Sequence, residues 1–308
     1  MVLILDKNKE EIRSEWLGKA NLLTETLPFM KRYSNKVIVV KFGGNAMGKK
    51  EYVDSFAKDI AFLQQVGILP VVVHGGGPQI GEMLSKLKIK TEFINGLRIT
   101  DATTVDVVEM VLSGVINKSI VTAISNSGAK AVGISGKDGN LIIAKRLLQT
   151  DNDSESNVEK AIDLGYVGEP EVIDPKVIDA LISEKMIPVI APVGMSRDGQ
   201  TYNINADTAA GAISASMKAS RMIMLTDVSG VLDQNGNLIT ELTVSEAEDL
   251  IKNKVVLGGM IPKLKTCIDA VLGGAEASVI MDGRMSHSLL LELFTEHGVG
   301  TIIRKNPN

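Results

Sequence analysis

The chain has 308 residues, of which 44% are hydrophobic and 23% are charged, and its formal net charge is −4. This length is enough to bury a large core, either as one big α/β domain or as two lobes. The mild acidity argues against non-specific binding to nucleic acid, which needs a basic face.

Residues 1–34 are predicted to form a helical arm in front of the main body. Apolar residues recur at helical spacing, and Pro28 is expected to close the helix. The apolar stripe consists of Ile12, Trp16, Leu23, Leu27 and Met30. Such a helix either packs on its own domain or serves as an oligomerisation arm.

The N-terminal segment does not fit a targeting signal. The opening MVLIL gives way at once to DKNKEEIRSEW, which is wrong for a signal peptide. We also expect no apolar run that approaches the ~20 residues of a membrane span. The sequence therefore predicts a cytoplasmic protein without a membrane partner.

Two apolar strands, predicted at residues 37–42 and 68–73, are each followed by a glycine run. The runs read KFGGNA and VVHGGGP. Glycines at the carboxyl end of a buried strand let backbone N–H groups approach an anion, and a following helix adds its positive N-terminal end. Either run alone is equally well explained as a tight turn. Together, and with Lys41 at the end of the first strand, they suggest phosphoryl transfer between two bound molecules.

Neither glycine run matches a standard nucleotide fingerprint. The stretch GGNAMGKK fits the P-loop pattern until Lys50, which replaces the hydroxyl that would hold magnesium. Gly75, Gly77 and Gly81 are spaced G-x-G-x-x-x-G, so the dinucleotide pattern G-x-G-x-x-G fails as well. A nicotinamide-dependent dehydrogenase is therefore disfavoured.

The rest of the chain alternates helices and strands. Helices are predicted at residues 51–65, 78–87, 103–127 and 175–184, strands at 186–191 and 221–228, and further helices from residues 245 and 262. Asp138-Gly139 is a hairpin signal, and the acidic stretch at residues 151–160 is expected to be a surface loop. Apolar strands flanked by helices predict a mainly parallel sheet that is covered on both faces.

Arg98, in GLRIT, stands in an otherwise uncharged stretch. A guanidinium can bind a carboxylate with two parallel hydrogen bonds, which lysine cannot match geometrically. A surface arginine in a loop is the ordinary alternative.

Polar residues also occur at two predicted helix starts. In NINADTAA, Asn205 is explained as the helix cap, and Asp207 suits the first helical turn, where a negative charge is favourable. Helix capping does not explain Asn203, whose amide can hold a polar substrate. Lys263 follows Pro262 in a first turn, where a cation opposes the helix dipole at a cost of about 0.3–1 kcal/mol. A transferring phosphate would compensate this cost, although a solvated lysine would also tolerate it.

Metal and disulfide chemistry find little support. The single cysteine, Cys267, excludes an internal disulfide and is interpreted as a core residue. His74, His287 and His297 lack zinc-ligand spacing, so no protein metal site is expected.

Six motifs occur in one order along residues 36–304: KFGGNA, VVHGGGP, NGLRIT, NINADTAA, LTDVSGVL and GGMIPK. In this order they resemble the amino acid kinase family, and within it the branch that acts on N-acetyl-L-glutamate. The resemblance implies a three-layer αβα sandwich with a mainly parallel open sheet, plus the N-terminal helix. It also implies that ATP, with Mg²⁺, phosphorylates the side-chain carboxylate to give N-acetyl-L-glutamyl 5-phosphate in arginine biosynthesis.

The same resemblance implies roles for individual residues. Lys41 and Lys263 match lysines that stabilise the transferring phosphoryl group, and Asp207 matches the aspartate that positions them. The implied substrate ligands are Gly75, Gly76, Gly77, Arg98 and Asn203. The implied ATP ligands are Gly43, Gly44, Asp227, Val228, Ser229, Gly230, Val231 and Leu232. Since the nucleophile is already a carboxylate, no catalytic base is needed, and Mg²⁺ would be held largely by phosphate oxygens and water.

Both ends of the chain resemble the arginine-inhibited members of this family. In those proteins N-terminal helices interlace dimers into a hexamer, so residues 1–34 would be the oligomerisation arm. Residues 35–195 would bind the acyl-amino acid and dimerise, and residues 196–308 would bind the nucleotide. The implied arginine ligands are Glu292, Gly298 and, more weakly, Lys218. A solvated glutamate and a helix C-cap glycine are the alternatives.

Two further functions stay open. The same fold could act on N-acetyl-aminoadipate, because one methylene is worth only ~1–3 kcal/mol. A non-catalytic amino-acid-sensing module is also conceivable, although it would have no use for Lys41, Asp207 and Lys263 together.

Overall fold

The structure is a computed structural model that describes residues 9–94, 96–152 and 159–306. Its centre is an eight-stranded sheet in the order β14-β16-β15-β13-β1-β2-β10-β5. Within the described residues its ladders are parallel except that between β15 and β16. The strands are β1 (Val37–Phe42), β2 (Leu69–His74), β5 (Ala131–Ser135), β10 (Ile187–Ala191), β13 (Arg221–Thr226), β14 (Glu241–Thr243), β15 (Ala277–Asp282) and β16 (Thr301–Arg304).

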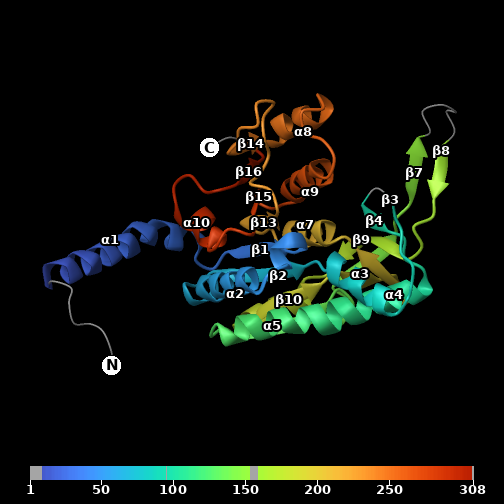
Figure 1. Ribbon diagram of the computed structural model, residues 1–308, viewed down its shortest axis with the longest axis horizontal. Helices are drawn as coiled ribbons and strands as arrows, with labels where there is room; N and C mark the ends of the chain where they lie inside the picture. The colour runs from blue at the N-terminus through green and yellow to red at the C-terminus, as the bar shows by residue number, and fades with distance from the viewer. Residues whose placement is uncertain (1–8, 95, 153–158, 307–308) are drawn as a thin grey trace.

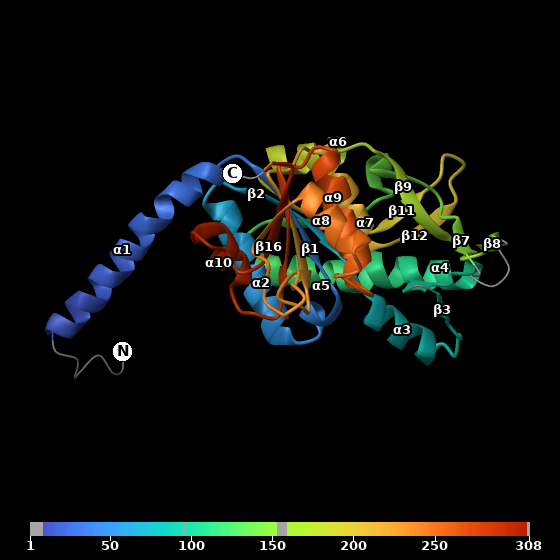
Figure 2. The same cartoon turned by 90° about the horizontal axis from the view of Figure 1, so that it is seen from above.

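Helices cover both faces of this sheet (Figures 1 and 2). Side chains of a strand point alternately to its two faces, so in β1 Ile38 and Val40 enter one core cluster and Val39 enters the other. One face is covered by α2 (Lys50–Gln65), α4 (Ala102–Glu109), α5 (Asn117–Asn126) and α10 (Ser288–Phe294), and the other by α6 (Lys176–Ser183), α7 (Ala206–Ser216), α8 (Val244–Lys252) and α9 (Met260–Leu272). The predicted αβα sandwich is confirmed.

Smaller β elements stand beside one end of the sheet. A closed barrel contains β6 (Ile142–Arg146), β9 (Val167–Ile173), β11 (Val193–Met195) and β12 (Thr201–Ile204). Two hairpins join β3 (Phe93–Ile94) to β4 (Leu97–Arg98) and β7 (Gln149–Asn152) to β8 (Glu159–Ile162). With α3 (Gly77–Lys86), they lie at the right-hand end of the molecule in Figure 2, opposite α1.

The N-terminal helix α1 (Lys9–Tyr33) contains Pro28 rather than closing there, so that detail of the prediction is wrong. A proline removes one backbone hydrogen bond, which packing of the following turn can offset. Tyr33 is buried, and Phe29 and Met30 pack against the core. The outer part of α1 projects from the body (Figure 1), with large apolar side chains exposed at Trp16, Leu17, Leu22, Leu23 and Leu27.

The helix predicted at residues 103–127 consists of α4, a π-helical segment (Met110–Ile116) and α5 in succession. It begins at Asp101, whose side chain accepts the N–H of Thr104. By length and composition alone, Ala102–Asn126 could cross a membrane, which corrects the expectation that no run is long enough. Its inner residues pack against the sheet, as in the core helix of a soluble protein.

One local prediction is wrong, and a second is wrong at its two ends. Asp138-Gly139 lies in a 3₁₀ turn between β5 and β6, and these strands pair with other strands. The Asp138 carboxylate accepts hydrogen bonds from the N–H and hydroxyl of Ser135, which closes the turn locally. The ends of the predicted loop at residues 151–160 belong to β7 and β8, and residues 153–158 lie outside the described residues.

The predicted lobes share one sheet. β13, from the second lobe, pairs with β1 of the first, so the sheet is continuous across both. The expected boundary after residue 195 falls within the β11–β12 hairpin. The division into residues 1–34, 35–195 and 196–308 stays a prediction.

Candidate active site

The two glycine runs meet at the carboxyl edge of the sheet. β1 and β2 are parallel neighbours, and their last residues, Phe42 and His74, are paired. The Gly75 N–H donates to the Phe42 carbonyl over 2.8 Å, which brings the runs into contact. A Cβ on Gly43 would lie 3.1 Å from the Gly75 nitrogen, and Gly44 has a φ of +61°. Close approach and left-handed backbone therefore both favour glycine here.

Two lysines and one aspartate form the charged centre of the site. Lys41 Nζ, on β1, lies 2.9 Å from Asp207 Oδ1, and Lys263 Nζ, on α9, lies 3.0 Å from Asp207 Oδ2. The Lys263 contact is a hydrogen bond, whereas the Lys41 contact is an ion pair without hydrogen-bond alignment. Asp207 stands in the first turn of α7, where the Asn205 side chain accepts two backbone N–H groups.

The ion pairs decide the charge of this centre. Burial alone raises the pKa of Asp207, but the ammonium groups of Lys41 and Lys263 outweigh it, so this pKa lies below its ordinary value of 3.8. Asp207 is thus ionised at neutral pH and orders both lysines. Two cations and one anion leave a net positive charge that can attract an anion.

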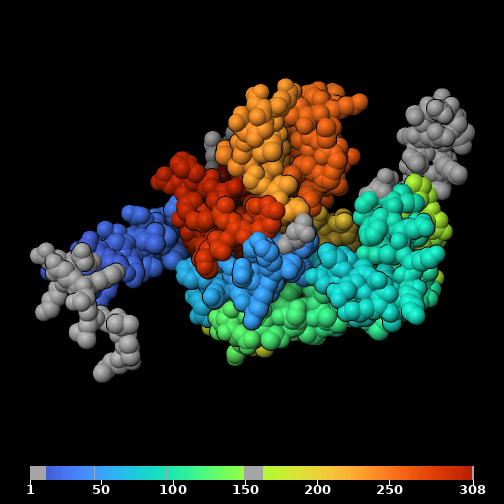
Figure 3. All heavy atoms as spheres, in the orientation of Figure 1, coloured from blue at the N-terminus to red at the C-terminus, as the bar shows by residue number. Residues whose placement is uncertain are grey.

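A cavity of about 250 Å³ opens beside this trio. It lies at the carboxyl ends of parallel strands, where open α/β sheets bind their ligands. Its walls contain Lys41, Gly44, Asp207 and the residues predicted to bind substrate: Gly75, Gly76, Gly77, Arg98 and Asn203. Lys263 reaches Asp207 from the α9 side. Figure 3 shows a hollow between the α8–α9 side, in orange, and the α3–α4 side, in cyan.

A larger cavity, of about 630 Å³, lies at the opposite end of the same strands. Its walls include Leu69, at the start of β2, and Met186, directly before β10. It contains none of the predicted site residues, as far as the chain is described. The smaller cavity, beside the charged trio, is therefore the candidate active site.

Arg98 is held at the cavity wall by the β3–β4 hairpin. Its Nη1 donates to Thr91 Oγ1 at 2.8 Å and its Nη2 to the Gly77 carbonyl at 3.0 Å. The guanidinium also lies 4.5 Å from the centre of the Phe93 ring. Burial lowers the pKa of Arg98, but the group stays charged. The arginine is thus ordered beside the glycine run rather than free in a surface loop.

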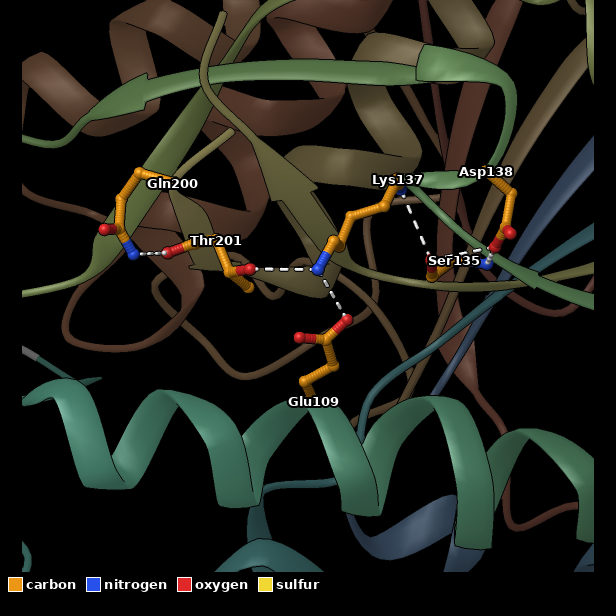
Figure 4. A network of polar contacts seen from close by, with 6 residues as sticks. All are labelled: Glu109, Ser135, Lys137, Asp138, Gln200 and Thr201. Atoms are coloured by element: carbon orange, nitrogen blue, oxygen red, sulfur yellow. Dashed lines mark hydrogen bonds and ion pairs between the residues drawn. The ribbon is translucent and has the colours of Figure 1, made fainter. Parts of the chain in front are cut away.

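Asn203 lies on β12, and a polar network anchors the start of this strand (Figure 4). Lys137 Nζ donates to Glu109 Oε1 at 2.8 Å and to Thr201 Oγ1 at 3.0 Å. The network drawn contains Glu109, Ser135, Lys137, Asp138, Gln200 and Thr201. It connects α4 and the β5–β6 turn to β12, and so fixes the strand two residues before Asn203.

The predicted ATP segment, residues 227–232, follows β13 at the same edge of the sheet. Val231 N–H donates to Thr301 Oγ1 at 2.8 Å. Gly230 has a φ of +150°, and a Cβ there would lie 2.5 Å from the same hydroxyl. Asp227 and Val228 remain exposed beside the strand end, while Val231 is buried. The segment follows the strand that pairs with β1, which carries Lys41, but it lies outside the walls of the 250 Å³ cavity.

Comparison with known proteins decides the family. The family model of the amino acid kinases matches residues 36–282. This chain belongs to the amino acid kinase family. An acetylglutamate kinase from Parvibaculum lavamentivorans is 57% identical over 300 residues, which cover 97% of this chain and 99% of that protein. One from Rhodospirillum rubrum is 58% identical over 294 residues, which cover 96% of this chain and 95% of that protein.

A solved structure shares the amino acid kinase fold over most of this chain. It is the N-acetylglutamate synthase from Neisseria gonorrhoeae complexed with coenzyme A and N-acetyl-glutamate, at a TM-score of 0.80 and 24% identity. The alignment covers 94% of this chain and 64% of that one. At this identity the likeness concerns the fold alone.

A further cavity of the kinase, of about 200 Å³, lies between the end of α1, α10 and the sheet. Glu292 and Gly298 line it, and Lys218 does not line it within the described part of the chain. Glu292 Oε2 accepts the N–H groups of Val299 at 2.8 Å and Gly300 at 3.2 Å. Burial raises the pKa of Glu292. Gly298 has a φ of +61°, and a Cβ there would lie 2.5 Å from Glu292 Oε2.

Several residues that the fold brings to these cavities have no distinctive motif in the sequence. Three arginines line the 200 Å³ cavity together with Glu292, namely Arg32, Arg221 and Arg304. In the sequence His74 stands out only as a possible metal ligand, yet it lies buried beneath the second glycine run. Its place directly before that run was the available signal. Cys267 is buried and its pKa is raised by burial, as expected of a core residue.

Proposed function

We propose that this chain transfers the γ-phosphoryl group of ATP to the side-chain carboxylate of N-acetyl-L-glutamate. The product is N-acetyl-L-glutamyl 5-phosphate, an intermediate of arginine biosynthesis. The observation that carries the proposal is the pair of lysines on Asp207, beside a cavity lined by the second glycine run and Arg98. The near-full-length identity to two proteins named acetylglutamate kinase supports this substrate.

The reaction needs alignment and charge neutralisation rather than a base. The attacking group is already a carboxylate, so catalysis comes from holding the reactants in line and stabilising the transferring phosphoryl group. Lys41 approaches that group from β1, and Lys263 approaches it from α9. Asp207 holds both ammonium groups in place before the reactants arrive. Such preorganised charges act most strongly where water is excluded.

Substrate recognition divides among three elements. Arg98 binds the α-carboxylate, because its guanidinium is ordered at the cavity wall. Asn203 binds the acetamido group or the α-carboxylate with its own donor and acceptor. The N–H groups of Gly76 and Gly77 are assigned to phosphate and substrate. Gly75 lines the same cavity, but its N–H donates to the Phe42 carbonyl.

The nucleotide lies across the carboxyl ends of β1 and β13. Gly43 and Gly44 face the phosphates, and residues 227–232 contact the remainder of ATP. The residues described include no group of three or more His, Cys, Asp or Glu that could hold a metal. Asp207 is moreover already paired with two lysines. This fits a Mg²⁺ ion that arrives with ATP and is held by phosphate oxygens and water.

The substrate is tested by measuring ADP release with a coupled assay. N-acetyl-L-glutamate should give the highest kcat/KM, above N-acetyl-aminoadipate, glutamate and aspartate. A preference for N-acetyl-aminoadipate would instead indicate a pocket that fits the longer substrate. One additional methylene changes binding by ~1–3 kcal/mol. ADP release with none of the four would contradict the proposal and favour a sensing module.

We also propose that L-arginine inhibits the enzyme by binding in the 200 Å³ cavity. Three arginines and three glutamates, Glu241, Glu292 and Glu296, put both signs of charge on its walls, which suits a ligand with a carboxylate and a guanidinium. Arg32, near the end of α1, is one of these groups, so the ligand would contact the helical arm. Lys218 is not needed for this site.

The arm is the proposed oligomerisation element. Its apolar residues are 57–66% exposed at Trp16, Leu17, Leu22, Leu23 and Leu27, which is a large apolar surface to leave in water. We propose that these helices interlace dimers into a hexamer in the cytoplasm. Inhibition by arginine should be measured beside light scattering on the intact chain and on a chain lacking residues 1–26. An intact enzyme indifferent to millimolar arginine would rule out the allosteric site.

A further inference from the structure

His74 is the last residue of β2 and is completely buried directly beneath the second glycine run. Its Nδ1 lies 3.0 Å from the Gly75 carbonyl oxygen, and its Nε2 lies 3.3 Å from the Asn117 amide nitrogen. A carbonyl oxygen only accepts and an amide nitrogen only donates. The imidazole therefore carries its proton on Nδ1. Nε2 is unprotonated, because it faces the Asn117 NH₂ group, whose two hydrogens are shared among three acceptors. Burial also lowers its pKa to about 4, so it is neutral under physiological conditions.

Asn117 fixes this tautomer. It is buried at the start of α5, directly after the π-helical segment. Its amide nitrogen lies 2.8 Å from the Val189 carbonyl and 3.2 Å from the Ile134 carbonyl, while its Oδ1 accepts from Lys118 Nζ at 3.1 Å. A flipped amide would place oxygen against two carbonyl oxygens. The side chain is thus held with its NH₂ group towards His74.

The hydrogen bond from His74 determines the direction of one peptide group. In a trans peptide the C=O and the following N–H point in opposite directions. Because the Gly75 oxygen is bound to buried His74, the Gly76 N–H points away from His74, and Gly76 itself lines the cavity. The Gly75 N–H is already used by Phe42. Gly76 precedes the first turn of α3, where N–H groups have no partner within the helix.

Neighbouring side chains hold the same glycine from another direction. A Cβ on Gly76 would lie 2.2 Å from Ile116 Cδ1 and 2.8 Å from Leu112 Cδ2. Both residues belong to the π-helical segment, which ends immediately before Asn117. One irregular stretch of helix thus packs on Gly76 and supplies the residue that orients His74.

We propose that His74 is a positioning residue, which holds the Gly75–Gly76 peptide so that the Gly76 N–H faces the transferring phosphoryl group. The role rests on the proposed kinase reaction. Without this bond a Gly–Gly peptide can rotate easily, since neither residue has a Cβ to restrict it. Loss of one transition-state donor lowers kcat by about 10²–10³-fold, so a mispositioned donor should cost at least about tenfold.

Three substitutions separate this role from packing. In His74→Asn the side-chain amide occupies the Nδ1 position and can still donate to the Gly75 carbonyl. In His74→Gln it occupies the Nε2 position, where it can only replace the contact with Asn117, and His74→Leu removes both contacts. We expect His74→Asn to retain kcat within about threefold and the other two variants to lose at least about tenfold. The KM for ATP and for N-acetyl-L-glutamate should stay nearly unchanged in all three.

A second readout reports on the transition state alone. Affinity for the complex of MgADP, aluminium fluoride and N-acetyl-L-glutamate should fall in parallel with kcat, whereas ATP affinity should not. Equal losses in the Asn and Gln variants, or losses confined to KM, would overturn the proposal. Failure of the wild-type enzyme to phosphorylate any substrate would instead refute the proposed function.

The tautomer can be checked without any variant. The ¹⁵N spectrum of histidine-labelled wild-type protein should show one of the three histidines neutral, with its proton on Nδ1, from pH 6 to 9. A proton on Nε2 would leave nothing to bind the Gly75 carbonyl and would overturn the inference even if every variant failed to fold. Loss of the His74 resonance pattern in His74→Asn provides the assignment.

Discussion

The most informative perturbation is Asp207→Asn, because it removes one charge from the centre of the site and keeps the side-chain shape. In the wild-type protein this carboxylate lies 2.9 Å from Lys41 Nζ and 3.0 Å from Lys263 Nζ. In the variant two ammonium groups would face a neutral amide that can accept through only one oxygen. We therefore expect the variant to be less stable and its two lysines to be less well aligned.

The structure sets the size of the effect. At 3 Å and an effective dielectric constant of about 20, two unit charges attract by roughly 5 kcal/mol before desolvation is counted. Removing one partner of a buried pair costs about 3–5 kcal/mol. The Lys263 side chain is 24% exposed and can be hydrated again in the variant, so we expect a cost at the lower end of this range. The free energy of unfolding should therefore fall by about 3 kcal/mol, and kcat by ~10²–10³-fold, as for loss of transition-state charge stabilisation.

Denaturant unfolding and steady-state kinetics test this prediction, with Asp249→Asn on the exposed side of α8 as the matched control. The free energy of unfolding of the control variant should stay within about 0.5 kcal/mol of the wild-type value, and its kcat should be unchanged. Because the folded-state pKa of Asp207 lies below 3.8, its stabilising contribution is complete above that value and is lost as the pH falls through the folded-state pKa. The stability gap between wild type and Asp207→Asn should thus be constant from pH 6 to 8 and shrink below about pH 4. An Asn variant with wild-type kcat would refute the reasoning.

Four further predictions concern other parts of the site. Lys41→Ala or Lys263→Ala should lower kcat by at least ~10²-fold with little change in KM. Near-normal turnover in either variant would show that this lysine does not stabilise the transferring phosphoryl group. Arg98→Lys should raise the KM for N-acetyl-L-glutamate but not for ATP, because lysine keeps the charge and loses the bidentate geometry; equal changes in both would mark a structural role. Lys137→Met should also raise only the KM for N-acetyl-L-glutamate, through the anchored start of β12, and an unchanged KM would show that Asn203 needs no such anchor. Gly298→Ala should weaken arginine inhibition and spare catalysis, since a Cβ would lie 2.5 Å from Glu292 Oε2; unchanged inhibition would place the arginine site elsewhere.

Much of the sheet and its glycine turns could be predicted from the sequence. β1 has the predicted bounds, and β2 is shifted by one residue at each end, because runs of β-branched residues that end in glycine are strong local signals. The same patterns placed Lys41 and Asp207 at a strand end and a helix start. Other local signals misled: Pro28 lies within α1, and Asp138-Gly139 is no hairpin, because packing of Tyr33 and the Ser135–Asp138 bonds override local preference.

The sequence by itself determined the alternation of strands and helices, the glycine turns and the family, because these depend on periodicity and motifs among neighbouring residues. Only the tertiary structure decided which distant groups meet. Lys263 reaches Asp207 across 56 positions of sequence, and Asn117 reaches His74 across 43. Neither contact can be predicted from the spacing of the two residues along the chain. Each contact arises because parallel strands end at one edge of the sheet and helices from both faces converge on that edge.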